Sequence, residues 1–544
     1  MGLECELVAL LSELRDHLGF RRIEAGMRLL ERKRPLLESL SPESRNSGVL
    51  LGLVAQWVDA GFDSPALLCR LLSRFTRVSR TVLPLNDYLH VRMAEGVVAM
   101  SEEDFDCAAA HFRFVQSLEN EVEDNELFAV ANFWIGRSLR RVGQYDDALN
   151  YIRRGEELAL SCGYREMAAI MQAALSWLAF QKGRYHDALE LLARAEEALS
   201  RTDDFLSRGN IQSAYGRILR RQGRYERALD YFERAIAEYR SSGGGQTQLA
   251  RALRNRAFVK RQLALQTQKQ FDSVSASRRS GRGDSEPAQR SADQRLKIEE
   301  IRAAAAADLD EAMAIYARHH HHAGIAGVHI NRAFLCLDSG DLECAAAESA
   351  EAFRYGAEKR EYLVMARART LQCTVEIAAV EEQLGDPGRH KEAAEAFARD
   401  AVLFAGQTQN RRLLARAYVW QGLTRVAEPA GDLDGARHCY EKAAALLEPE
   451  ALERQHAWDD LEKLKAAVLR AAPVDALLRA WSAGHVGEKS FQQITEDFSR
   501  LLIPKVWELE GRKVSRVAER LSISPKKVRR ILYSAGVLDR PIAE

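Results

Sequence analysis

Long apolar runs are missing from this sequence. Charged residues interrupt every apolar run before it reaches the roughly 20 residues that would span a bilayer. The first residues, Met-Gly-Leu-Glu-Cys-Glu-Leu, also lack the basic segment followed by an apolar stretch that a secretory signal has. We therefore expect a soluble, cytoplasmic protein with no membrane partner.

An excess of one sign of charge is missing too. The chain holds 78 Lys and Arg against 78 Asp and Glu, so any surface for a nucleic acid must be local. The eight cysteines are scattered singly, without a C-x-x-C pair or a ligand-like spacing to histidines. We expect them to be small, mostly buried thiols in a reducing cytosol.

Catalytic motifs are absent as well. There is no H-E-x-x-H or G-x-S-x-G motif, and the three glycines at 243–245 precede Gln-Thr-Gln rather than the Gly-Lys-Ser/Thr of a phosphate-binding loop. In a run of four histidines, His319 and His322 lie about one helical turn apart, where they could share a metal. Histidines at a helix end more often satisfy its terminal carbonyls. We expect no enzyme, no cofactor and no metal site, with a metal at this run as the open alternative.

What the sequence does have is a repeat with a period of 40 residues. One set of residues recurs in the same order three times: Gly136, Gly143, Tyr145, Ala148, Ile152 and Gly155, then Ser176, Gly183, Tyr185, Ala188, Leu192 and Ala195, then Gly216, Gly223, Tyr225, Ala228, Phe232 and Ala235. The alanine, the bulky residue four positions later and the small residue three further share one helix face. The glycine of each Gly-x-Tyr tolerates the left-handed backbone that ends a helix.

This pattern resembles the tetratricopeptide repeat, in which two antiparallel helices pack through small and bulky residues at fixed positions. The usual unit has about 34 residues, so longer helices are expected here. Weaker copies include Gly96, Phe105, Ala108 and Phe112 upstream, and Gly340, Leu342, Ala345, Ala352, Ala393, Ala394, Phe397, Leu433, Ala436, Tyr440 and Ala443 downstream. The resemblance implies an all-α fold, a tetratricopeptide-like right-handed helical solenoid of roughly eight or nine units. We place divergent helical repeats in residues 1–82 and the tetratricopeptide-like repeats in residues 83–470.

One repeat is interrupted. Its two helices are predicted at about residues 246–265 and 297–318, with Leu309, Ala312 and Tyr316 on the inner face of the second. Between them, residues 267–295 are rich in Ser, Arg, Gln and Gly, with Phe271 and Val274 as the only sizeable apolar residues. Such a composition does not bury a core, so we predict a disordered insertion at about 267–295.

A second domain follows the repeats. Pro473 and the Gly-His-Val-Gly stretch at 484–487 indicate a linker over residues 471–489, and a new helical pattern starts near Ser490. Residues 514–533 fit two short helices joined by a tight turn. Ser515 is expected to cap the first and Ser524 the second, which would have Pro525 at its first position. The side chains expected inward are Val517, Ala518, Leu521, Val528 and Leu532, with Ile523 sealing the turn.

Residues 490–544 resemble the Fis-type helix-turn-helix, and the likeness extends over about 491–538. The matching positions are Ala518, Leu521, Ile523, Ser524 and Leu532. Three departures are Ser522 for the usual turn glycine, Val517 for a small alanine, and Lys513 where Asn is common. A serine at a turn position with positive φ costs on the order of 1 kcal/mol, which the fold tolerates.

Charge supports a small C-terminal helix-turn-helix domain that contacts double-stranded DNA. Residues 511–540 hold nine basic and two acidic residues, a net charge of +7 in a neutral chain. The alternative is a solvated basic helix that caps the solenoid. The residues expected at DNA are Ser524, Lys526, Lys527, Arg529, Arg530, Arg516 and Lys513. The resemblance also implies a homodimer, formed through the apolar face of Phe491, Ile494, Phe498, Leu501, Leu502 and Val506.

These observations predict a DNA-binding transcriptional regulator of bacterial type, whose solenoid binds a protein or peptide in its concave groove. Groove residues expected on the first helix of each pair are Asn132, Arg137, Asn210, Arg217, Asn255 and Asn331. The alternative is a scaffold or adaptor whose C-terminal helices contact only protein. An exposed positive stripe along the 525–535 helix would favour DNA over that alternative.

Overall fold

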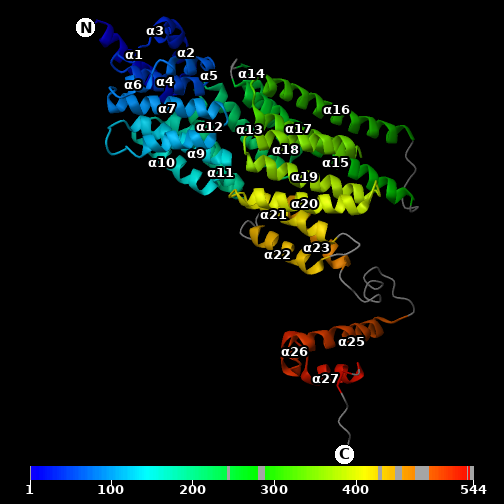
Figure 1. The fold of residues 1–544 in the computed structure, drawn as a ribbon. Helices are drawn as coiled ribbons and strands as arrows, with labels where there is room; N and C mark the ends of the chain where they lie inside the picture. Colours follow the sequence, from blue (N-terminus) through cyan, green and yellow to red (C-terminus); the bar gives the residue numbers. More distant parts are fainter. Residues whose placement is uncertain are drawn as a thin grey trace, which may run out of the picture. The chain divides into compact units, whose positions relative to one another are not determined.

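The computed structural model describes residues 2–241, 245–279, 288–426, 432–447, 456–471, 489–535 and 537–538. The chain divides into two compact units, residues 1–465 and 466–544. Within the described residues every regular element is a helix (Figure 1). None of these helices is both long and apolar enough to cross a membrane.

The first unit begins with helices that do not follow the 40-residue pattern. They are α1 (Gly2–Gly19), α2 (Ile23–Arg32), α3 (Arg34–Glu38), α4 (Ser47–Asp59), α5 (Pro65–Leu72) and α6 (Arg77–Arg80). α4 carries ten buried residues, among them Trp57, which is fully enclosed. A side chain at Gly26 would overlap the Trp57 ring, so this glycine lets α2 approach α4 closely.

Eight helical pairs and a final helix follow, stacked in chain order (Figure 1). They are α7 (Leu85–Ser101) with α8 (Phe105–Gln116), α9 (Asn125–Val142) with α10 (Tyr145–Ser161), α11 (Arg165–Gln181) with α12 (Tyr185–Leu199), α13 (Phe205–Arg221) with α14 (Tyr225–Ser241), α15 (Gln246–Arg279) with α16 (Ala288–Arg318), α17 (His322–Asp338) with α18 (Leu342–Glu358), α19 (Tyr362–Glu381) with α20 (Pro387–Gly406), α21 (Arg411–Val426) with α22 (Leu433–Leu447), and then α23 (His456–Ala471). The longer helices expected from the 40-residue unit are confirmed.

The repeated residues have the roles that their spacing predicts. Gly143, Gly183 and Gly223 end the first helices of three pairs with φ of 90°, 76° and 72°, the left-handed region. The alanines and bulky residues of the second helices are fully buried, and they are Ala148, Ile152, Ala188, Leu192, Ala228 and Phe232. A Cβ at Gly136 would lie 2.3 Å from Cγ1 of Ile152, so the small residue sets how closely the paired helices approach.

The predicted disorder at 267–295 was wrong for residues 267–279 and 288–295, which are helical in α15 and α16. Gln, Lys, Arg and Ala form helices readily, and an antiparallel pair needs only one apolar stripe. Phe271 is 9% exposed, the Arg295 guanidinium lies 5.5 Å from its ring centre, and Ile298 is buried. Residues 280–287 lie outside the described residues.

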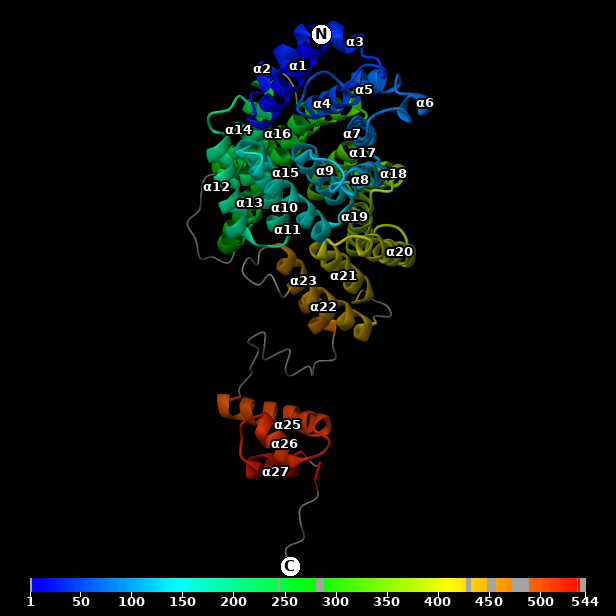
Figure 2. The ribbon, with the colours of Figure 1, turned by 90° about the vertical axis from the view of Figure 1, so that its left-hand side faces the viewer.

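The solenoid also closes on itself, because connections far apart in sequence meet (Figure 2). The backbone N–H of Gln409 donates to the carbonyl of Gly143 at 2.8 Å. Asn410 Nδ2 donates to the hydroxyl of Tyr145 at 3.2 Å. These contacts join the α9–α10 turn to the α20–α21 turn, although more than 260 residues separate them.

Four cysteines depart from the expectation of single, mostly buried thiols. Cys336 and Cys344 form a disulfide between α17 and α18. Cys69 and Cys107 are exposed, while Cys373 and Cys439 are buried. Isolated positions in the sequence did not indicate the pair, because the tight turn between the two helices brings residues eight positions apart together.

Candidate functional site

Within the second unit, the described residues from Lys489 onward form a three-helix module, with α25 (Phe491–Leu509), α26 (Val514–Arg520) and α27 (Pro525–Ser534). Ser490 caps α25 in a reciprocal arrangement with Gln493, so this helix begins beside the residue near which a new helical pattern was expected to start. The core of the module consists of Ile503, Val506, Val517, Ala518, Val528, Ile531 and Leu532. Residues 491–538 therefore contain a small apolar core of their own.

The turn between α26 and α27 has the predicted local chemistry. Ser522 has a φ of +51°, the left-handed angle expected where the resembled family has glycine. The Ser524 hydroxyl accepts the backbone N–H of Lys527 at 3.2 Å, and Pro525 occupies the first helical position. Ser515 does not cap α26: the helix begins one residue before it, and Lys513 at the cap makes no side-chain bond.

The outer face of α27 is basic. Val528 and Leu532 are fully buried, which leaves the four basic side chains of the helix exposed: Lys526, Lys527, Arg529 and Arg530. None of the four has an ion-pair partner among the described residues. Arg516 and Lys513 are exposed on and beside α26, whereas the nearby Arg520 pairs with Glu510. A set of unneutralised positive charges thus lies along one short helix.

α25 carries an exposed apolar face. Phe491 is 85% exposed and Phe498 is 42% exposed, while Ile494 and Leu501 are half-buried. Leu502 was expected on this face but packs against the core of the module, and Val506 is part of that core. Near the middle of α25, apolar residues lie on both the core face and the exposed face of the helix. The sequence pattern alone therefore did not show which of these residues belong to the core.

The residues expected in the solenoid groove have different outcomes. Asn132 is 1% exposed and donates to the carbonyl of Phe128 at 2.9 Å, so its side chain is bonded within its own helix, α9. Arg137 pairs with Asp59. Asn331 donates to the carbonyl of Gly327 at 3.1 Å. All three side chains are therefore bonded within the protein. Each of the two asparagines bonds the carbonyl four residues earlier, as asparagine in a helix readily does.

The sequence analysis did not identify a group of arginines to which Arg217 belongs. Asn210 and Asn255 form hydrogen bonds with other members of this group. Burial, with the charge of Arg251 as the next cause, lowers the pKa of Arg217 to about 9. Burial and neighbouring arginines also lower the pKa of Arg220 to about 9. One signal was available in the sequence: Arg140 and Arg220 occupy the same position two repeats apart, a shift of 80 residues.

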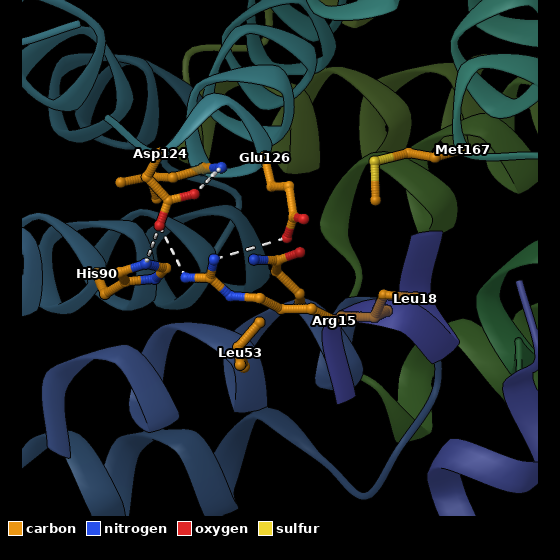
Figure 3. Close-up of a pocket in the computed structure, with 9 residues that line it drawn as sticks. Arg15, Leu18, Leu53, His90, Asp124, Glu126 and Met167 are labelled. Carbon is orange, nitrogen blue, oxygen red and sulfur yellow. Dashed lines mark hydrogen bonds and ion pairs between the residues drawn. The ribbon is translucent and has the colours of Figure 1, made fainter. Parts of the chain in front are cut away.

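A small pocket lies where α1 meets the first repeats (Figure 3). Arg15 donates to Oδ2 of Asp124 at 2.7 Å, and His90 Nε2 lies 3.4 Å from the same oxygen. Oδ1 of Asp124 accepts the backbone N–H of Leu127. Hydrogen bonds and charges from His90 and Arg15 outweigh burial and hold the pKa of Asp124 well below its usual range. The charged groups of this pocket are therefore used in joining α1 to α9.

The histidine run contacts a carboxylate of a distant turn. His321 Nδ1 lies 2.8 Å from Oε1 of Glu103, and the backbone N–H of His322 donates to Oε2 at 2.7 Å. These two histidines join the α16–α17 turn to the α7–α8 turn rather than satisfying helix-terminal carbonyls.

A model of the tetratricopeptide repeat matches residues 207–268. No curated protein matches the chain. A structure of a Rap protein complexed with competence and sporulation factor is 14% identical, covers 74% of this chain and 98% of its own, and has a TM-score of 0.51. The apo form of the quorum sensor NprR from B. thuringiensis is 11% identical, covers 82% of this chain and 99% of its own, and has a TM-score of 0.37. With the observed helical pairs, the match to the repeat model and the likeness to the Rap structure show that the fold of the first unit is a tetratricopeptide-type helical solenoid.

Proposed function

We propose that the chain is a cytoplasmic, DNA-binding transcriptional regulator, without catalytic activity, in which α27 enters the major groove. The observation that carries the proposal is the exposed face of α27, where four basic side chains have no ion-pair partner among the described residues. The turn before it, with Ser522 in the left-handed region and Ser524 as cap, supports the proposal, because the sequence resembles a Fis-type helix-turn-helix at this turn.

The roles of the basic residues follow from their chemistry. Arginine bonds guanine through two parallel hydrogen bonds, so we assign base contacts to Arg529 and Arg530. Lysine more often neutralises phosphate, so Lys526 and Lys527 are assigned to the DNA backbone, with Arg516 and Lys513 beside them. Replacing either arginine by Ala should weaken binding at the cognate site by roughly 1 to 3 kcal/mol and relax its base preference.

The solenoid is proposed to receive the signal, as a protein or peptide partner. The support is the fold: stacked helical pairs create an extended inner surface. The structurally similar Rap protein was crystallised with competence and sporulation factor. On this proposal the partner changes how the regulator acts at DNA.

The alternative of a scaffold whose C-terminal helices contact only protein finds support in the exposed Phe491 and Phe498. We assign this face instead to a second copy of the chain, because a regulator that reads two half-sites must present two α27 helices. Light scattering should then show a dimer for the parent protein and a monomer for Phe491→Asp with Phe498→Asp. A monomeric parent would remove the dimer.

The test of the proposal is a variant in which Lys526, Lys527, Arg529 and Arg530 are all replaced by Ala. Binding to genomic DNA fragments should be lost, and the slope of log K against log salt should fall by about 0.9 for each phosphate contact removed. The matched control removes four exposed arginines from second helices of the repeats, namely Arg113, Arg153, Arg194 and Arg227. If the α27 variant is folded by circular dichroism and binds as tightly as the parent, the scaffold is the better proposal.

A further inference from the structure

Six arginines from four first helices of the solenoid lie near one another. We call them the arginine cluster: Arg140 of α9, Arg217 and Arg220 of α13, Arg251 and Arg254 of α15, and Arg367 of α19. Each feels the charge of at least one other member, and none forms an ion pair with a carboxylate among the described residues. The charge of Glu361 raises the pKa of Arg367, but the ion pair that Glu361 forms is with Arg141, at 3.5 Å.

Neutral side chains hold the cluster in place. Arg251 donates to Oδ1 of Asn210 at 3.0 Å, and the Tyr239 hydroxyl donates to the same oxygen at 3.0 Å. Arg220 donates to Oδ1 of Asn255 at 3.1 Å. An Asp at either position would have bonded the guanidinium and cancelled its charge. An amide fixes the position of the arginine and leaves the positive charge available.

Aromatic rings support Arg140 and also Arg220. The Arg140 guanidinium lies 5.0 Å from the ring centre of Trp177, and that of Arg220 lies 4.7 Å from the ring centre of Phe258. A ring face attracts a cation without removing its charge. Stacking and amides therefore position Arg140, Arg220 and Arg251, which leaves their remaining N–H donors for a further acceptor.

The cluster is enclosed and yet reaches solvent. Burial is the main cause that lowers the pKa of Arg140, Arg217, Arg220 and Arg367. Even so, Arg367 is exposed, and the other five members are half-buried. These arginines are surrounded by protein and still contact solvent, and they lie on the first helices of their pairs. We therefore take them to face water on the inner side of the solenoid. The contacts of Asn410 with Tyr145 and of Glu103 with the α16–α17 turn close the solenoid around this inner side.

We propose that the arginine cluster binds a small anion that carries several phosphate groups. Like charges gathered in an enclosed place destabilise the empty protein, and a compact polyanion relieves that cost. A guanidinium bonds phosphate through two parallel hydrogen bonds, and a phosphate monoester carries about 1.5 to 2 negative charges. The site is on the solenoid and does not depend on α27 binding DNA.

An acidic peptide fits the cluster less well. An extended peptide places its residues about 3.3 to 3.6 Å apart and brings backbone amides that need partners. The amide oxygens that would accept the N–H groups of such a backbone are already engaged, because Oδ1 of Asn210 accepts two donors and Oδ1 of Asn255 accepts from Arg220. The six cationic groups are left for dense negative charge.

The test uses sodium tripolyphosphate and ATP as probes in isothermal titration calorimetry with the full chain. We expect tripolyphosphate to bind with a micromolar Kd, and the double variant Arg217→Gln with Arg251→Gln to weaken it at least tenfold. The matched control, Arg153→Gln with Arg194→Gln on outer helices, should leave the Kd unchanged. The cluster variant should fold and melt at or above the parent temperature without the probe, because it removes repulsion. It should also lose the rise in melting temperature that the probe gives the parent.

Hexaglutamate and single-stranded oligothymidylate are titrated in parallel. All titrations are repeated in the variant whose four basic residues of α27 are replaced by Ala, so that any binding measured there cannot occur at α27. The test of the arginine cluster is then separate from the test of DNA binding by α27. Failure of both tripolyphosphate and ATP to bind below millimolar concentration overturns the proposal. So does tighter binding of hexaglutamate or the oligonucleotide, or binding that the cluster variant keeps.

Discussion

Replacing Glu103 by Gln removes one negative charge from a buried contact that closes the solenoid. Its carboxylate accepts the backbone N–H of His322 at 2.7 Å and lies 2.8 Å from Nδ1 of His321. Arg141 is 3.7 Å away. Burial alone would raise the pKa of Glu103, but the hydrogen bond and charge of His321, with the charge of Arg141, lower it from 4.5 to about 2.

The magnitude follows from the shift. A pKa lowered from 4.5 to about 2 corresponds to roughly 3 kcal/mol of stabilisation of the charged form in the folded protein. Because the folded pKa is the lower one, this contribution is present above pH 4.5 and is lost as the pH falls towards 2. Its largest part comes from His321, which carries a charge only while its imidazole is protonated. At about pH 5.5, below the ordinary histidine pKa of about 6.5, Glu103→Gln should therefore make local opening of the α16–α17 turn easier by an amount of this order.

Hydrogen exchange measured by mass spectrometry reads this opening directly. The amides of His322 and Ala323, which bond Glu103, should lose protection by about 100-fold in the variant at about pH 5.5, where a histidine with an ordinary pKa is protonated. Glu102→Gln is the matched control, because Glu102 is the exposed neighbour of Glu103. Equal protection in Glu103→Gln and the parent would refute the closing role of this carboxylate.

Three further outcomes test the fold. Phe232→Ala should lower the free energy of unfolding by about 3 to 5 kcal/mol, since this ring is fully buried, and urea denaturation should show a much smaller loss for the partly exposed Phe114→Ala. In the C-terminal module, Ser522→Gly should stabilise and Ser524→Ala should destabilise, each by about 1 kcal/mol, and melting followed by tryptophan fluorescence distinguishes these signs. Phe271→Ala should cost about 3 kcal/mol in the same denaturation assay, and an unchanged stability would restore the disordered insertion.

The arginines illustrate why a partner surface is hard to read from sequence. Asn132 and Arg137 were expected in a groove, but one is buried in its own helix and the other pairs with Asp59. Arg254 and Arg367 were not singled out, because they lie on different repeats and their proximity depends on how far each pair rotates from the last. A residue pattern records which face of a helix is polar, and it does not record which polar faces converge.

The sequence by itself determined the helical pairs, the glycines that end their first helices, and the caps at Ser490 and Ser524. These features depend on residues within one or two turns of each other, where backbone geometry fixes the neighbours. Only the tertiary structure decided the pairing of the long helices beyond residue 267, the contact of Glu103 with His321, and the arginine cluster. Each of these requires residues from separate helices to meet, and small rotations accumulated over several repeats determine which ones do.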